Sequence, residues 1–229
     1  MYPAQQPLSQ HLRDSHLQSW TRIGSPGDFF SARDRIEMVR VARDATLCEF
    51  CEDRKAALSP NAISGKHLSS SRLSDVVVDM IHRLRTDPGR LTKSWFDQVT
   101  HEISRQEYVE IVSVVNSAVI IDTLHNALGL GVPSLPTAKQ GKPKKSYNTA
   151  AVDEGAWLPI LATEVAMADT GLPQVPNIVR SLGLVPSAVD LFFTTFRPHY
   201  ALKDIHLSIS QAQAEFVASR VSALNECFY

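Results

Sequence analysis

The sequence SRQEYVEIVSVVNSAVIIDTLHNAL, residues 104–128, decides the fold, because it predicts one long helix that is apolar on nearly all of its faces. Ser104 can cap the first turn, and Glu107 three residues later completes a capping box. Gly129, followed by Pro133, ends the helix. A helix that is apolar all round is usually buried, so we expect this one at the centre of its half of the protein.

Most of the remaining chain also shows the helical period. Apolar residues on one face predict an amphipathic helix over residues 73–84, and Trp95, Phe96 and Val99 mark a short helix over 92–99. Further helices are expected over residues 31–58, 157–168, 176–182, 186–200 and 210–228. Strand patterns are nearly absent, so we predict an all-α protein.

The prolines, glycines and lysines divide the chain. Residues 133–148 contain prolines, a glycine and four lysines, a composition typical of an exposed linker. The linker would join a first half, residues 31–132, to a related second half, residues 149–229. Residues 1–30 are polar and would form an N-terminal arm with one short helix.

The composition excludes several classes of function. The chain has 229 residues and a net charge of -1, which argues against nucleic-acid binding. Three cysteines are too few for a disulfide scaffold. The richest apolar run, residues 109–121, is shorter than the roughly 18 to 20 residues that cross a membrane. The N-terminus does not resemble a secretory signal, so we expect a cytoplasmic protein with reduced thiols.

The sequence Cys48-Glu-Phe-Cys51 is the strongest chemical motif. Helix positions three apart share a face, so the two sulfurs can form a disulfide where the geometry permits. Lys55 is a nearby cation that would favour the reactive thiolate, whereas the neighbouring carboxylates oppose it. A packed pair of thiols without chemistry is the alternative. Zinc is not expected, because no third or fourth ligand lies nearby in the sequence.

A pattern that begins with glutamate and ends in cysteine occurs twice. Glu37 precedes Cys48 by eleven residues, and Glu215 precedes Cys227 by twelve. The segment ISQAQAEFVASRVSALNECFY, residues 209–229, resembles the core helix of the alkylhydroperoxidase-D / carboxymuconolactone decarboxylase family. In that family a glutamate is followed, after a twelve-residue step, by Cys-x-x-Cys-x-x-x-His.

Other parts of the chain are similar to the same family. Residues 107–116 and 123–129 resemble its closing helix, so the resemblance covers most of the chain outside the arm and linker. The chain departs from the family pattern in both halves. Lys55 occupies the position of the family histidine, and the second copy stops at Tyr229 before a second cysteine.

The resemblance implies a thiol-dependent peroxidase in which Cys51 attacks a hydroperoxide and Cys48 resolves the product. It implies no metal or haem cofactor, a dithiol or lipoyl-type protein as reductant, and assembly into a trimer or hexamer. Glu37, about 16 Å before Cys48 along one helix, would act only through a proton relay. The candidate relay histidines are His82, His101 and His125.

Two other interpretations stay open beside the peroxidase. A lactone decarboxylase or isomerase, as in the other branch of the family, would rely on histidine and glutamate instead of the cysteine pair. A catalytically inactive helical scaffold would explain the missing histidine. Residue by residue, Glu215 is also explained by an ion pair with an arginine, Cys227 by a thiol without a partner, and His125 by packing in the core.

Overall fold

The computed structural model describes residues 1–67, 69–162, 177–199 and 208–224. Of the described residues, 60% are helical and 2% lie in strands, which confirms the all-α class. Its helices are α1 (Gln10–Ile23), α2 (Ala32–Asp44), α3 (Glu49–Ala56), α4 (Asp75–Thr86), α5 (Lys93–Glu102), α6 (Arg105–Ala127), α8 (Asn177–Leu182), α9 (Pro186–Phe196) and α10 (Gln211–Leu224). Two short strands, β1 (Ala151–Val152) and β2 (Ile160–Leu161), pair antiparallel.

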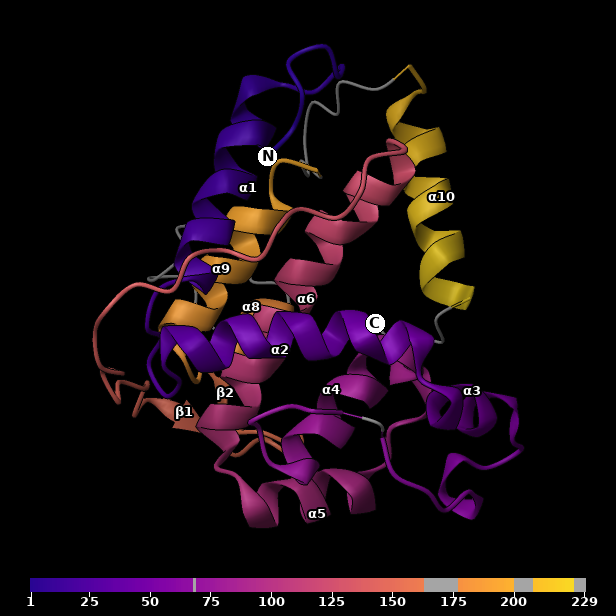
Figure 1. The fold of residues 1–229 in the computed structure, drawn as a ribbon, viewed down its shortest axis with the longest axis vertical. Coiled ribbons are helices and arrows are strands. Elements are labelled where there is room, and N and C mark those ends of the chain that lie inside the picture. Colours follow the sequence, from indigo (N-terminus) through magenta and orange to yellow (C-terminus); the bar gives the residue numbers. More distant parts are fainter. Residues whose placement is uncertain (68, 163–176, 200–207, 225–229) are drawn as a thin grey trace.

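Helix α6 lies at the centre, with α2, α4 and α9 packed around it (Figure 1). The predicted capping box is present: Ser104 Oγ accepts from the Glu107 N–H at 3.2 Å, and the Glu107 carboxylate accepts from the Ser104 N–H at 2.8 Å. By length and composition α6 would also suit a membrane, which the apolar run in the sequence had not suggested. However, 67% of its most apolar window is buried inside the protein, as in a core helix.

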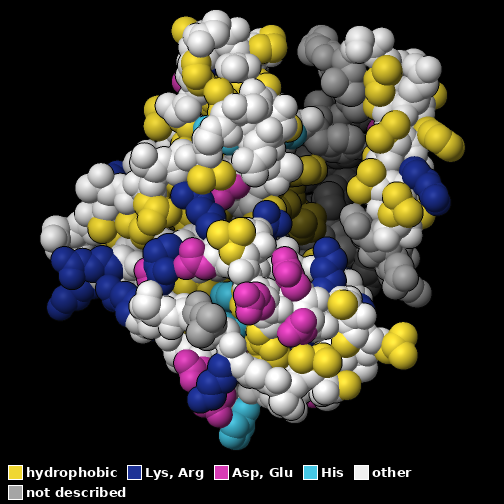
Figure 2. All heavy atoms as spheres, turned by 45° about the vertical axis from the view of Figure 1, so that its right-hand side comes forward, with side chains coloured by type: hydrophobic (Ala, Val, Ile, Leu, Met, Phe, Trp, Pro, Cys, Tyr) yellow, Lys and Arg dark blue, Asp and Glu magenta, His cyan; other side chains and the backbone are white. Residues whose placement is uncertain are grey.

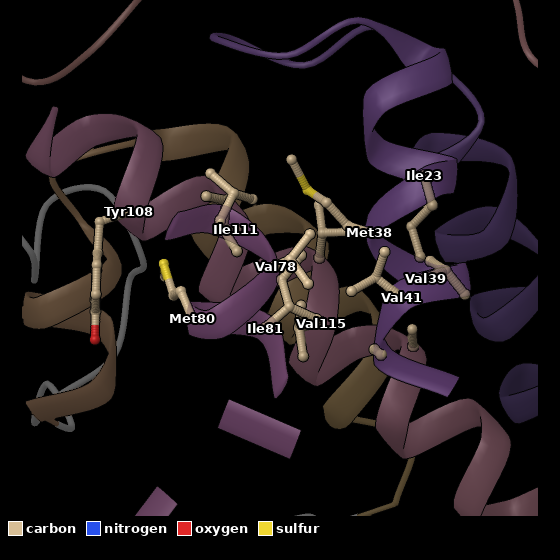
Figure 3. Packing of buried hydrophobic residues seen from close by; sticks show 14 of the residues in the cluster. Ile23, Met38, Val39, Val41, Val78, Met80, Ile81, Tyr108, Ile111 and Val115 are labelled. Carbon is tan, nitrogen blue, oxygen red and sulfur yellow. The ribbon is translucent and has the colours of Figure 1, made fainter. Parts of the chain in front are cut away.

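The main core forms where α2, α4 and α6 meet. Figure 3 shows Met38, Val39 and Val41 of α2 beside Val78 of α4 and Val115 of α6, all of them buried. The same apolar cluster continues to other elements through Trp20, Ile23 and Leu191. Segments that the sequence divides into an arm and two halves therefore contribute to a common core.

The lysine-rich segment follows the turn between α1 and α2. The Lys139 N–H donates to Gly24 O and the Lys145 N–H donates to Asp28 O, both at 2.7 Å. The Trp20 indole N–H donates to Ser134 O at 2.9 Å. Residues 133–148 have no helix or strand, as expected, but these hydrogen bonds hold them along the body of the protein (Figure 1).

The helix predicted over residues 31–58 is wrong in its continuity. Helix α2 ends at Asp44, a 3₁₀ turn covers Ala45–Leu47, and α3 begins only at Glu49. Cys48 between them has an extended backbone, with φ -85° and ψ 111°. The break lets α3 pack against α4 instead of continuing along the axis of α2, so tertiary packing overrides local helix propensity.

The helix predicted over residues 157–168 is also wrong where the structure describes it. Residues Ile160–Leu161 form β2, and the Leu161 carbonyl accepts a hydrogen bond of 2.8 Å from Arg180 Nε. The side chain of Trp157 lies against Phe96 instead of on a helix face, with ring centroids 5.6 Å apart. Residues 163–168 lie outside the described part of the chain.

Helix α10 presents apolar side chains to solvent. Phe216 is 72% exposed and Leu224 is 66% exposed, with Val217 and Val221 about half exposed between them. Figure 2 shows hydrophobic side chains along this helix. The prediction of a helix near residues 210–228 is confirmed over Gln211–Leu224.

Candidate cysteine–histidine centre

Four side chains from three consecutive segments meet beside α4. Cys48 is the N-cap residue of α3, and Cys51 lies in the first turn of that helix. His67 comes from the loop between α3 and α4, and His82 lies in the middle of α4. We call these four residues the Cys–His centre. They converge because the break after α2 turns α3 toward α4.

The sulfur and nitrogen atoms of the Cys–His centre are in direct contact. His67 Nδ1 lies 3.4 Å from Cys48 Sγ and 3.6 Å from Cys51 Sγ. His82 Nδ1 lies 3.2 Å from Cys51 Sγ. One ligand atom from each of the four residues lies within 4.8 Å of the other three. Both cysteines are free thiols.

Asp79 fixes the orientation of His67. Asp79 Oδ1 lies 3.0 Å from His67 Nε2, and it also forms an ion pair with Arg54. The Trp95 indole N–H donates to Asp79 Oδ2 at 3.2 Å. Burial alone would raise the pKa of Asp79, but the hydrogen bonds from His67 and Arg54 hold it below its usual range. In the tautomer with its proton on Nε2, His67 donates that proton to the carboxylate, and the Nδ1 lone pair faces both sulfurs.

Burial keeps the inner half of the centre neutral. Cys51 is 4% exposed, and burial, followed by the neighbouring Cys48, raises the pKa of its thiol to about 12. Burial, followed by the charge of His67, lowers the pKa of His82 to about 4. At neutral pH the Cys51–His82 contact is therefore a thiol beside a neutral imidazole. Arg54 is the nearby cation that favours ionisation of the thiol.

A pocket of about 510 Å³ opens beside Cys48, which is half-buried. Phe50 and Gly65 are among the residues that line it. A Cβ atom on Gly65 would lie 2.6 Å from the Phe50 ring, so glycine is needed for this close approach. Cys48 therefore meets solvent through the pocket, whereas Cys51 faces the interior.

Glu37 and Lys55, two other predicted site residues, lie apart from these contacts. Glu37 is on α2, and its Oε1 pairs with Arg40 Nη2 at 2.6 Å. The hydrogen bond from Arg40 lowers the pKa of Glu37 to about 2, against the opposing effect of burial. Because the helix is broken after Asp44, Glu37 is not on the helix that carries Cys51. Lys55 is exposed in the last turn of α3.

The second half does not complete this centre within the described residues. Glu215 on α10 accepts a hydrogen bond from Gln211 Nε2 at 2.8 Å. Cys227 lies outside the described part of the chain. The predicted counterpart site of the second half therefore stays a prediction.

Of the three histidines considered for a relay, the structure brings only His82 to the sulfurs. His101 is exposed on α5, and His125 packs in the core, where its Nδ1 lies 2.9 Å from the Ile121 carbonyl oxygen. Sequence reasoning missed His67. Two histidines following the Cys-x-x-Cys motif at intervals of 16 and 15 residues were the available signal. Zinc was not expected because no third or fourth ligand lies near the motif in the sequence. In the structure two histidines that are distant in sequence lie beside the two cysteines.

Comparisons with models of protein families, with curated proteins and with solved structures found no match to this chain.

Proposed function

We propose that the protein reduces hydroperoxides with the thiols of Cys48 and Cys51. The observation that supports this best is the 3.2 Å contact between Cys51 Sγ and His82 Nδ1, with the second thiol bridged to the first through His67. A thiol beside an imidazole is the arrangement that activates cysteine nucleophiles. The sequence resemblance to the alkylhydroperoxidase-D family supports the same chemistry and an alkylhydroperoxidase-D-like fold.

The reaction takes place in two steps. His82 accepts the Cys51 proton while the sulfur attacks the terminal oxygen of ROOH, and that proton leaves with the alkoxide as ROH. Cys51 is then a sulfenic acid. The Cys48 thiol attacks the Cys51 sulfur, a disulfide forms, and the hydroxyl leaves as water. The sum is two thiols and ROOH giving one disulfide, ROH and H₂O.

The two sulfurs have different surroundings, and the proposed reaction gives them different roles. Burial opposes ionisation of Cys51, whereas the charge of Arg54 favours its thiolate. His82 Nδ1 lies 3.2 Å from the sulfur, close enough to accept its proton during the attack. Cys48 lines the pocket, where a partner can reach its sulfur. A reduced dithiol or lipoyl-type protein would attack the disulfide at Cys48, become oxidised itself, and restore both thiols.

The remaining expectations belong to the same proposal. The protein acts in the reducing cytoplasm, which keeps the pair in its thiol form. It assembles as a homo-oligomer, a trimer or hexamer, and the exposed apolar side chains of α10 offer a surface for that contact.

Peroxide-dependent disulfide formation tests the proposal. The reduced full-length chain, freed of metal with a chelator, is mixed with a small excess of cumene hydroperoxide, and the disulfides are mapped by mass. We expect a Cys48–Cys51 bond in the parent and in the matched control His11→Gln, whose imidazole is exposed on α1. We expect slower oxidation in His82→Gln. Cys51→Ser abolishes peroxide consumption, whereas Cys48→Ser accumulates a sulfenic acid that dimedone traps.

Thiols that stay reduced in the parent would overturn the proposal and favour an inactive scaffold. Equal oxidation rates in the parent and His82→Gln would remove the imidazole from the mechanism.

A further inference from the structure

We propose that Cys48, Cys51, His67 and His82 together bind one zinc ion. The peroxidase chemistry above needs no metal, so this inference goes beyond it. The four residues supply two sulfurs and two imidazole nitrogens, one atom from each, all within 4.8 Å of one another. Cys₂His₂ is among the recurring ligand sets of structural zinc sites.

The distances between the ligand atoms fit a tetrahedral metal. Zinc binds thiolate sulfur at roughly 2.3 Å and histidine nitrogen at roughly 2.0–2.1 Å, so a sulfur and a nitrogen on one tetrahedral zinc lie about 3.6 Å apart. The three sulfur–nitrogen contacts in the centre are 3.2, 3.4 and 3.6 Å. Small adjustments of the side chains would therefore be enough to hold zinc, and the helices would not have to move.

The surroundings of the histidines favour a metal in two ways. Asp79 binds the Nε2 side of His67 at 3.0 Å, so the Nδ1 lone pair faces the sulfurs. A carboxylate behind a histidine is the usual support of a zinc-bound imidazole. His82 is 1% exposed, and its Nε2 has no hydrogen-bond partner among the described residues. Among the described residues, the polar contact of this ring is the one between Nδ1 and Cys51 Sγ, so a metal bond at Nδ1 would anchor a weakly held buried ring.

The donor set selects the class of metal and its role. Two thiolates with two imidazoles suit zinc better than magnesium or calcium, which prefer oxygen ligands. All four tetrahedral positions are taken by protein, which is the mark of a structural site and not of a catalytic one. The zinc would connect α3, the loop after it and α4, in addition to the Arg54–Asp79 ion pair and the hydrogen bond from Arg90 to the Arg54 carbonyl oxygen.

Zinc would also regulate the thiols, a consequence that rests on the proposed peroxidase function. Sulfurs bound to zinc cannot form a disulfide without leaving the metal. Two zinc-bound thiolates, one ROOH and two protons give one disulfide, ROH, H₂O and free Zn²⁺. The metal would thus protect the pair until an oxidant removes it.

Metal titration of the reduced full-length chain tests the site. Zn²⁺ is added in competition with a chromophoric chelator, and Co²⁺ is used as a spectroscopic probe. We expect one ion per chain, and an intense visible Co²⁺ spectrum with a thiolate charge-transfer band, the signature of tetrahedral sulfur ligation. Cys51→Ala and His82→Ala abolish that spectrum. Asp79→Asn weakens zinc binding about 10–100-fold, whereas the matched control Asp97→Asn, on the surface of α5, does not.

If an alanine variant unfolds, a variant that exchanges one ligand for another still tests the site. His67→Cys retains four ligands, so it should still bind Co²⁺ and strengthen the charge-transfer band. The inference is overturned by a weak octahedral Co²⁺ spectrum in the parent, or by zinc affinity that is the same in Cys51→Ala and His82→Ala as in the parent. The peroxide assay uses metal-free protein, so failure of the zinc site and failure of the peroxidase are observed separately.

Discussion

Two groups of histidines in this protein, each with at least one buried ring, have opposite surroundings. The first is the Cys–His centre beside α4. The second, which we call the N-terminal histidine cluster, consists of Tyr2, His16, His125 and His199. In this second cluster the Tyr2 hydroxyl lies 2.5 Å from His16 Nδ1, and His16 Nε2 lies 2.7 Å from His199 Nε2. His125 stacks on Tyr2 with ring centroids 4.3 Å apart.

The difference lies in where the nitrogens point. In the N-terminal histidine cluster one ring nitrogen of His16 faces the Tyr2 hydroxyl and the other faces His199. Both nitrogens of His16 therefore have partners within the cluster. In the Cys–His centre His67 Nδ1 and His82 Nδ1 both face sulfur, and His82 Nε2 has no partner within the described ranges. Burial of a histidine is therefore not a sign of function; convergence of lone pairs on a shared point is.

The largest expected effect is the stabilisation of the Cys–His centre by zinc. At a free zinc concentration about a thousandfold above Kd, binding adds about 4 kcal/mol to the free energy of unfolding. His82→Ala should lose this increment and His16→Phe should keep it. Urea unfolding of the reduced protein with and without zinc measures both. An equal zinc increment in His82→Ala and the parent would remove the distinction between the two histidine groups.

The second effect is the cost of opening the N-terminal histidine cluster. His16→Phe removes the hydrogen bonds of His16 to the Tyr2 hydroxyl and to His199, each worth about 0.5–1.5 kcal/mol because neither partner is fully buried. Urea unfolding of the metal-free protein measures the loss. Zinc affinity should stay the same in this variant; a tenfold change would show that the two groups are coupled.

Acid should destabilise the metal-free protein through both groups. Burial, followed by His199, lowers the pKa of His16 to about 4, and burial lowers that of His82 to about 4. The unfolded chain therefore binds these protons first. Stability is complete above the ordinary histidine pKa of about 6.5 and falls as the pH drops from there toward 4, by up to about 1.4 kcal/mol per pH unit for each proton.

Unfolding free energies measured across that pH range test this sign. His16→Phe and His82→Phe should each flatten the slope. A slope that is steeper in either variant than in the parent would contradict the assigned direction of the shift.

The smallest effect is a difference between the two sulfurs. Cys48 borders the pocket, whereas Cys51 is 4% exposed and its thiol pKa is raised to about 12 by burial. In metal-free protein iodoacetamide should therefore modify Cys48 before Cys51, as peptide mass spectra over time would show. Zinc should slow the modification of both cysteines. It should do so to the same extent in His16→Phe as in the parent. Faster modification of Cys51 would contradict the burial argument.

The sequence was sufficient for local features of the fold. The capping box of α6 and the apolar surface of that helix gave its start, its end and its central place, because each depends on neighbours within one or two turns. The break at Cys48 and the short strand at Ile160–Leu161 depend on packing against α4 and on Arg180, which no local pattern contains.

The candidate site was predictable only in part for the same reason. Cys48 and Cys51 are recognisable because they are three residues apart. His67 and His82 reach them from 16 and 31 residues beyond Cys51, through a turn and a helix whose placement follows from the core. The contribution of Arg54 to Cys51 ionisation likewise came from the fold, whereas the sequence had suggested the next residue, Lys55.

Zinc release during oxidation is the sharpest test that the two cysteines and two histidines act as one centre. The zinc-loaded chain is treated with hydroperoxide while a chromophoric chelator reports free Zn²⁺ and mass spectrometry reports the Cys48–Cys51 disulfide. We predict one zinc ion released for each disulfide formed, along the same time course. Disulfide formation with the zinc retained, or oxidation of a chain that never bound zinc under saturating conditions, would show that the four residues do not act together.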